Sequence, residues 1–143
     1  MNNFEEIFEY LKDNLINWKY KDTTPNVSGE GFNDHNVMET VGTLPAANVF
    51  DYVFIQQPLM NTHSITTGNS TTRRSTQTYT IEVYCKRGVN KVGTARALLE
   101  NVNYIIDLFL KLGFAVSASP PNLKHLNDDT ARQVLTITKT FIS

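Results

Sequence analysis

A long amphipathic helix constrains the fold of this chain more than any other feature of its sequence. Apolar residues recur at three- and four-residue steps over about 18 residues, a length of roughly 27 Å that can cross a small sheet. Asn90 or Thr94 can cap the start, and Gly113 can end the helix in the left-handed conformation. The apolar seam comprises Leu98, Val102, Ile105, Phe109 and Leu112, widened by Ala95, Leu99, Ile106 and Leu110, with Tyr104 and Leu108 nearer the far side.

Two segments before this helix have the composition of strands. Residues 78–86 alternate cleanly, so that Tyr79, Ile81, Val83 and Cys85 face one way. Thr78, Thr80, Glu82, Tyr84 and Lys86 face the other way, a pattern typical of a sheet packed on one face. Residues 49–55 are β-branched or aromatic on both faces apart from Asp51, which indicates a strand covered on both sides, with a neighbouring subunit as one candidate cover.

The two ends of the chain complete the pattern. At the N-terminus, Asn3 and Glu6 can form a capping box, and an apolar stripe predicts a helix that ends before Asp22. The C-terminal part reads as a hairpin of a strand at 114–117 and a closing strand at 134–142, with a break at Pro120 and Pro121 and a turn at 127–129. Residues 26–45 read as loop with a short strand around 37–41.

These elements predict a single α+β domain over residues 1–143. The order of helix, strands, helix and strand pair favours a mainly antiparallel sheet with both helices on one face. A chain of 143 residues with 41% hydrophobic content can bury one core without disulfides or a structural metal.

Residues 61–74 are nearly all small and polar, with Gly68 and Asn69 as a turn centre and Arg73 and Arg74 at the base. Because so little apolar surface is available to fix this segment against a core, the sequence predicts a mobile arm. An arm of this kind can contact a partner or line a lumen. The candidate contact residues are Asn61, Thr67, Gly68, Asn69, Arg73 and Arg74.

The charge of the chain gives no long-range attraction to nucleic acid or to anionic membrane, since the net charge is only −1. Locally, Arg73 and Arg74 could join Lys86, Arg87 and Lys91 in a small basic patch that touches DNA phosphates without reading bases. The plainer alternative is a pair of solvated arginines at the start of a strand.

No residue pattern points to catalysis, a cofactor or a metal. His35, His63 and His125 lie in loop-like segments without partners at ligand spacing, and adjacent Asp128 and Asp129 are typical turn formers. The single cysteine, Cys85, excludes an intramolecular disulfide and is expected to be a buried apolar side chain. The N-terminus has no signal-peptide pattern and no segment is apolar enough to span a membrane, so a cytosolic site of folding is expected.

The outer face of the predicted sheet is the remaining candidate surface. Thr80, Tyr84, Thr136 and Thr138 are expected to lie on it, together with Thr78 and Thr140. Such a face is suited to a contact with another subunit, and it is equally typical of a solvent-exposed sheet surface.

The order of these segments resembles that of a known structural family. An amphipathic N-terminal helix precedes a strand at 49–55, and a polar arm leads into the strand at 78–84. A long helix then ends at Leu112, Gly113 and Phe114, and a hairpin with Arg132 precedes the final strand. This arrangement is similar to the tail terminator, or tail-completion, proteins of long-tailed bacteriophages and to related neck proteins at the head–tail joint.

The resemblance implies a structural virion protein rather than an enzyme. Its expected form is a hexameric ring that caps the tail tube, with the tail-tube protein and the head–tail connector as partners. Its location would be the tail or neck of the virion, after assembly in the host cytoplasm. Two alternatives stay open, a head-completion or neck subunit of a phage and a small ligand-binding α+β module with a concave apolar pocket.

Overall fold

The computed structural model describes residues 4–20, 32, 37–39, 51–56, 59–67, 70–86, 91–122 and 130–142. They form two helices and six strands, which confirms the predicted α+β class. In chain order the elements are α1 (Phe4–Tyr20), β1 (Val37–Met38), β2 (Tyr52–Ile55), β3 (Leu59–Thr67), β4 (Ser70–Lys86), α2 (Lys91–Lys111), β5 (Ala115–Ala118) and β6 (Thr130–Ile142).

Strand β4 is the centre of a six-stranded sheet in the order β1-β2-β4-β6-β5, with β3 paired to β4 as well. All pairings are antiparallel except that of β1 with β2. On one side β4 pairs with β6 from Arg74↔Ile142 to Lys86↔Thr130. On its other side β4 pairs first with β3 and then with β2, because its 17 residues are longer than either partner.

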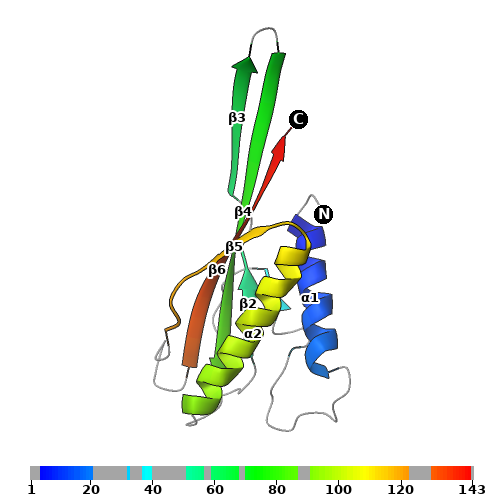
Figure 1. Cartoon of the computed structure of the whole chain (residues 1–143). Coiled ribbons are helices and arrows are strands. Elements are labelled where there is room, and N and C mark those ends of the chain that lie inside the picture. Colours follow the sequence, from blue (N-terminus) through cyan, green and yellow to red (C-terminus); the bar gives the residue numbers. More distant parts are fainter. Residues whose placement is uncertain are drawn as a thin grey trace.

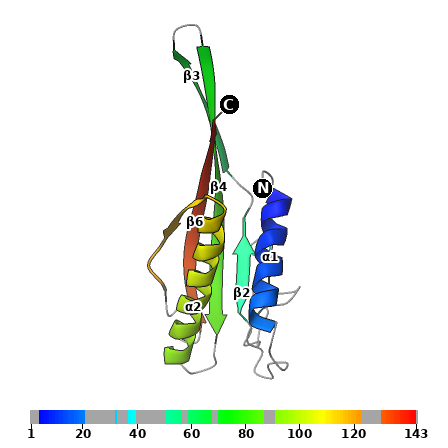
Figure 2. The same cartoon turned by 45° about the vertical axis from the view of Figure 1, so that its right-hand side comes forward.

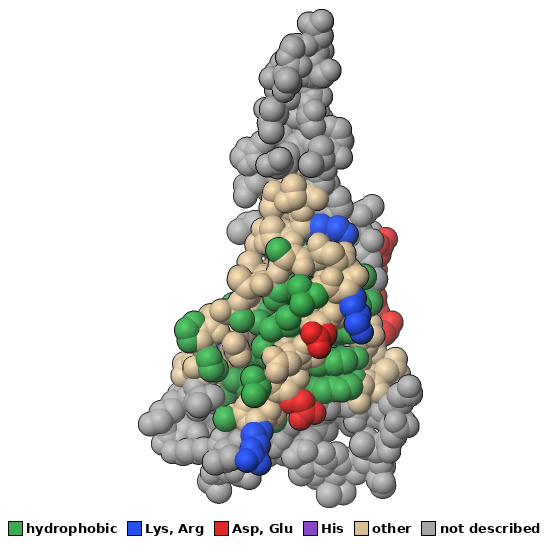
Figure 3. Space-filling view, viewed as in Figure 1, with side chains coloured by type: hydrophobic (Ala, Val, Ile, Leu, Met, Phe, Trp, Pro, Cys, Tyr) green, Lys and Arg blue, Asp and Glu red, His purple; other side chains and the backbone are tan. Residues whose placement is uncertain are grey.

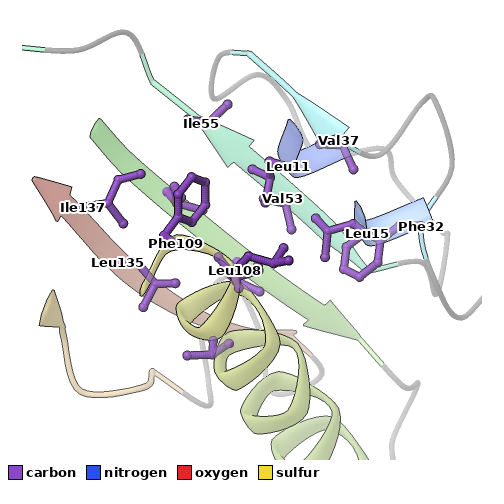
Figure 4. Packing of buried hydrophobic residues seen from close by; sticks show 14 of the residues in the cluster. Leu11, Leu15, Phe32, Val37, Val53, Ile55, Leu108, Phe109, Leu135 and Ile137 are labelled. Carbon is purple, nitrogen blue, oxygen red and sulfur yellow. The ribbon is translucent and has the colours of Figure 1, made fainter. Parts of the chain in front are cut away.

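Both helices lie on the same face of this sheet, as the sequence order predicted (Figures 1 and 2). The core forms where they meet the inward residues of β4 and β6, and Figure 4 shows Phe109 of α2 near Leu135 and Ile137 of β6. Tyr79, Ile81, Val83 and Cys85 are all buried there, in agreement with the period-two pattern. The inward-facing residues of β4, which recur at every second position, therefore lie in the core.

The two helices contact each other through aromatic side chains. The rings of Trp18 and Tyr104 stack with centroids 4.1 Å apart. The Tyr10 hydroxyl donates a hydrogen bond to the Leu108 carbonyl oxygen at 3.1 Å, and the Tyr104 hydroxyl donates to the carbonyl oxygen of Asn14 at 3.3 Å. Burial raises the pKa of Tyr10 and of Tyr104.

The end of α2 has the hydrogen bonds of a Schellman motif. The Phe114 amide donates to the Phe109 carbonyl oxygen and the Gly113 amide donates to that of Leu110, both at 3.1 Å. Gly113 has φ of 84°, in the left-handed region predicted for it. The rings of Phe109 and Phe114 lie 5.6 Å apart and supply the apolar contact that accompanies this motif.

The expected faces of α2 were partly wrong. Leu108, placed nearer the far side, is buried at 5% exposure, whereas Leu99 and Leu110, placed in the widened seam, are 60% and 53% exposed. The reason is the position of α1, which contacts α2 on its Tyr104 and Leu108 side and leaves the Leu99 and Leu110 side without cover from α1.

Candidate interaction surfaces

Strands β3 and β4 form a two-stranded ribbon that rises beyond the helices (Figures 1 and 2). Its nine pairs run from Leu59↔Thr78 to Thr67↔Ser70 in one unbroken register. Strand β6 accompanies β4 only as far as the pair Arg74↔Ile142, so the part of the ribbon beyond that pair has two strands among the described residues. We refer to residues 59–67 and 70–78 as the ribbon.

The sequence analysis predicted a mobile arm at 61–74 and did not predict strands there, but residues 61–67 and 70–74 are strand. The strand predicted to begin at Thr78 begins at Ser70. The reason is local propensity, since threonine and isoleucine favour extended backbone even in a segment with few apolar residues. The ribbon does project as an arm would (Figure 1). We refer to the rest of the described chain, with both helices and the remaining strands, as the body.

The candidate arm residues take defined positions in the ladder. Asn61 pairs with Thr76, Thr67 with Ser70, Arg73 with Ser64, and Arg74 with His63. Gly68 and Asn69 lie outside the described residues. Of the other members of the proposed basic patch, Lys86 ends β4 and Lys91 begins α2, while Arg87 is outside the described part of the chain.

The sheet face opposite the helices carries a ladder of threonines across β4 and β6. Thr80 pairs with Thr136, Thr78 with Thr138 and Thr76 with Thr140, and the hydroxyls of Thr78 and Thr138 lie 3.5 Å apart. Thr80, Thr136 and Thr138 are half-buried. The structure thus brings three of the four proposed subunit-interface residues together on one accessible surface.

Tyr84, the fourth residue of that set, is only 4% exposed, so its expected place on an open face was wrong. It packs in a second apolar cluster with Tyr52 and Phe54, whose ring centroid is 5.5 Å from that of Tyr84. The Tyr84 hydroxyl donates to Glu82 Oε1 at 3.3 Å. Burial raises the pKa of Tyr84, and the negative charge of Glu82 raises it further.

Glu82 and Arg132 form an ion pair that the sequence did not reveal. The Arg132 guanidinium donates through Nε to Glu82 Oε1 at 2.9 Å and also through Nη2, and Gln56 Nε2 donates to Glu82 Oε2 at 3.3 Å. The Glu82 side chain is 5% exposed and that of Arg132 31%. The hydrogen bonds to Glu82 are the main cause that raises the pKa of Arg132. Both oxygens of Glu82 are therefore satisfied within the sheet.

A second polar contact lies between the sheet and α2. The Asn101 side-chain amide donates from Nδ2 to Asp51 Oδ2 at 2.9 Å and to Cys85 Sγ at 3.2 Å. All three residues are fully buried. Cys85 is thus buried as predicted and accepts a hydrogen bond as well, so it links the end of β4 to α2 through Asn101.

The uncovered side of α2 and the adjoining edge strand β5 form an apolar surface. Leu99 and Leu110 are exposed and Ile106 is half-buried on the helix, while Ala118, which pairs with the inward-facing Leu135, is exposed on the same side of β5. Figure 3 shows hydrophobic side chains gathered over this side of the body. Pro120 and Pro121 follow β5 and are exposed, an arrangement that limits strand pairing at this end of the sheet.

No group of three or more His, Cys, Asp or Glu side chains is placed to hold a metal among the residues that the structure describes. His63 lies in β3 opposite Arg74, and His35, His125, Asp128 and Asp129 fall outside the described ranges. Neither described helix combines the length and the apolar character that crossing a membrane requires.

Comparison with known proteins gives no family to which this chain can be assigned, because no protein-family model and no curated protein matches its sequence.

Proposed function

We propose that this chain is a structural protein of a bacteriophage tail, a terminator that caps the tail tube as a ring of identical subunits and joins it to the head connector. One observation carries the proposal, namely the ribbon of β3 and β4 that continues the sheet beyond the helices (Figure 2). Beyond Arg74↔Ile142 this ribbon has no third strand among the described residues. A two-stranded ribbon is marginal in isolation, which favours a role in contact with another subunit.

The body beneath the ribbon is suited to packing between subunits. A closed ring needs two different patches on each subunit, one that binds the other patch on the next copy. The apolar surface of α2 and β5 and the threonine ladder of β4 and β6 lie on opposite faces of the sheet and differ in character. Each contact of this kind typically buries about 800 Å² per partner.

The polar clusters inside the sheet support a structural role. Glu82, whose side chain is nearly inaccessible, receives hydrogen bonds from Arg132, Tyr84 and Gln56. Such a carboxylate has its hydrogen-bonding capacity used by the fold itself. These contacts tie β2, β4 and β6 together, so they stabilise the sheet from which the ribbon extends.

The test is whether the purified chain forms a ring and binds the end of a tail tube. Size-exclusion chromatography with light scattering would give the subunit number. Addition of the chain to polymerising tail-tube protein is expected to shorten the tubes. A chain that stays a single copy and leaves tube length unchanged would contradict the proposal.

A matched variant isolates the contribution of the ribbon. Replacing residues 64–73 by Asn-Gly retains the five pairs from Leu59↔Thr78 to His63↔Arg74 and closes them with a two-residue hairpin turn. We expect this shortened variant to fold and to lose its effect on tube length. Pull-down of the intact chain with tail-tube protein and with portal-side connector separates a terminator from another neck subunit.

A further inference from the structure

The outer edge of β3 lacks the features that normally protect an edge strand. Natural edge strands are blunted by lysine, proline, bulges or short length. Strand β3 is nine residues long and contains no proline, lysine, arginine, aspartate or glutamate. Its register with β4 is continuous over all nine pairs, so no bulge turns the edge away. Such an edge is a template for another strand.

The ribbon has a second open edge on the other side of β4. The last pair of β4 with β6 is Arg74↔Ile142, so Ser70–Arg73 extend past it and pair only with β3 among the described residues. A strand placed against Ser70–Arg73 would continue the line of β6. These two edges, which no other described strand covers, therefore lie on opposite sides of the same ribbon.

The composition of the ribbon indicates that these edges are used. Between residues 59 and 78 only Leu59, Met60 and Ile65 are aliphatic or sulfur-containing apolar residues, too few to form a core. Two strands without a core are marginally stable in water, and a third and fourth strand add backbone hydrogen bonds on both sides. A partner that stabilises the ribbon must therefore supply strands to both edges.

We propose that the β3 edge of one copy of this chain pairs with the Ser70–Arg73 edge of β4 on the next copy, so that the ribbons form one continuous sheet around the assembly. A second copy is the partner because each copy carries both edges, and head-to-tail pairing covers the Ser70–Arg73 edge and the facing part of the β3 edge of every copy once the ring closes. The inference rests on the proposed ring and names the contact that closes it.

The hairpin register shows where each edge can be blocked. In a hairpin with a two-residue connection the closing pair, here Thr67↔Ser70, is hydrogen-bonded, and the pairs alternate from there. Ser64 and Thr71 belong to non-hydrogen-bonded pairs, so their amides point away from the partner strand. Ser64→Pro then removes an outward donor from β3 and Thr71→Pro removes one from β4, without loss of a bond inside the ribbon.

The experiment compares the two proline variants, alone and mixed, by light scattering. We expect each variant alone to be a single copy, since each lacks one of the two edges. An equimolar mixture is expected to form heterodimers, because Ser64→Pro retains the β4 edge and Thr71→Pro retains the β3 edge. The matched controls Ser64→Ala and Thr71→Ala keep both amides and are expected to assemble like the original chain.

Four outcomes would overturn the inference. Proline variants that are folded by circular dichroism and assemble fully would exclude these edges. Loss of assembly in Ser64→Pro alone would indicate β3 pairing with β3. An original chain that is a single copy yet shortens tail tubes would exclude the pairing between ribbons and leave the proposed function standing. An original chain that is a single copy and has no effect on tube length would exclude both the pairing and the proposed function. If a proline variant fails to fold, Ser64→Lys and Thr71→Lys test the same edges by charge.

Discussion

The ion pair of Glu82 and Arg132 shows how a single residue is held in this sheet. Glu82 lies on the face of β4 that points away from the helices, yet its side chain is only 5% exposed and accepts hydrogen bonds from three residues. A carboxylate in such a position depends on its partner, because removing the partner leaves a buried charge uncompensated. The pair therefore matters more for stability than the pair of Lys12 and Glu9, in which the Glu9 side chain is 51% exposed.

Substituting Arg132 by methionine should lower the free energy of unfolding by about 3 kcal/mol, since Glu82 then loses its countercharge in a buried site. Urea unfolding followed by the fluorescence of Trp18, the only tryptophan, measures this change. The double variant Glu82→Gln with Arg132→Met should recover most of the loss, and Glu9→Ala, which removes the exposed partner of Lys12, should change stability by less than about 0.5 kcal/mol. Equal losses in the single and double variants would show that the charge is not the cause.

Helices and strands with a strong hydrophobic periodicity were predictable from the sequence. The way in which these elements pack against one another was not. The spacing of Leu98, Val102, Ile105 and Phe109 specified α2, and the alternation from Tyr79 to Cys85 specified the inward face of β4. Strand β3 was missed because the prediction weighed the scarcity of apolar residues above the β-propensity of Thr62, Ile65 and Thr66. The exposure of Leu99 and the contact of Glu82 with Arg132 depend on helix placement and strand register, which one sequence does not specify.

The end of α2 offers a test of backbone conformation separate from packing. Gly113 has φ of 84°, and apart from its own and its two neighbouring residues no atom lies within 4 Å of where a Cβ would be. Gly113→Ala should therefore lower the free energy of unfolding by about 1 kcal/mol through backbone strain alone. Asparagine tolerates this conformation better, so Gly113→Asn should cost less in the same urea titration. A larger loss for asparagine than for alanine would contradict this account.

The aromatic layer between α1 and α2 should make folding sensitive to alkaline pH. Burial raises the pKa of Tyr10 and Tyr104 above the ordinary value of about 10. As the pH rises through that value the unfolded chain releases these protons before the folded chain does, so the contribution of these two tyrosines to stability is constant below about pH 10 and falls above it. Urea unfolding across this range measures the slope.

The double variant Tyr10→Phe with Tyr104→Phe provides the control for that slope. It removes both phenols and leaves the lysines unchanged, so its stability should fall less steeply above pH 10 than that of the original chain. Identical slopes in the two proteins would show that these tyrosines do not titrate differently in the folded and unfolded states.

At the scale of the whole molecule, the proposed ring couples assembly to folding. The body has its own core, in which both helices and β4 and β6 take part, so it should fold as a single copy (Figure 4). The ribbon adds two strand edges, and its sequence holds few apolar residues. Assembly through the ribbon should then raise thermal stability by mass action, because subunits bind one another only in the folded state.

The melting temperature of the original chain should accordingly rise with protein concentration. Each tenfold increase in the concentration of a binding partner well above its dissociation constant adds about 1.4 kcal/mol to the free energy of unfolding. The variant in which Asn-Gly replaces residues 64–73 keeps the body and should melt at one temperature at every concentration. Differential scanning calorimetry over a series of concentrations makes this comparison. The two proteins share the same core. A concentration dependence of the melting temperature that persists in the shortened variant would therefore place the subunit contact on the body. A melting temperature that is independent of concentration in both proteins would contradict assembly altogether.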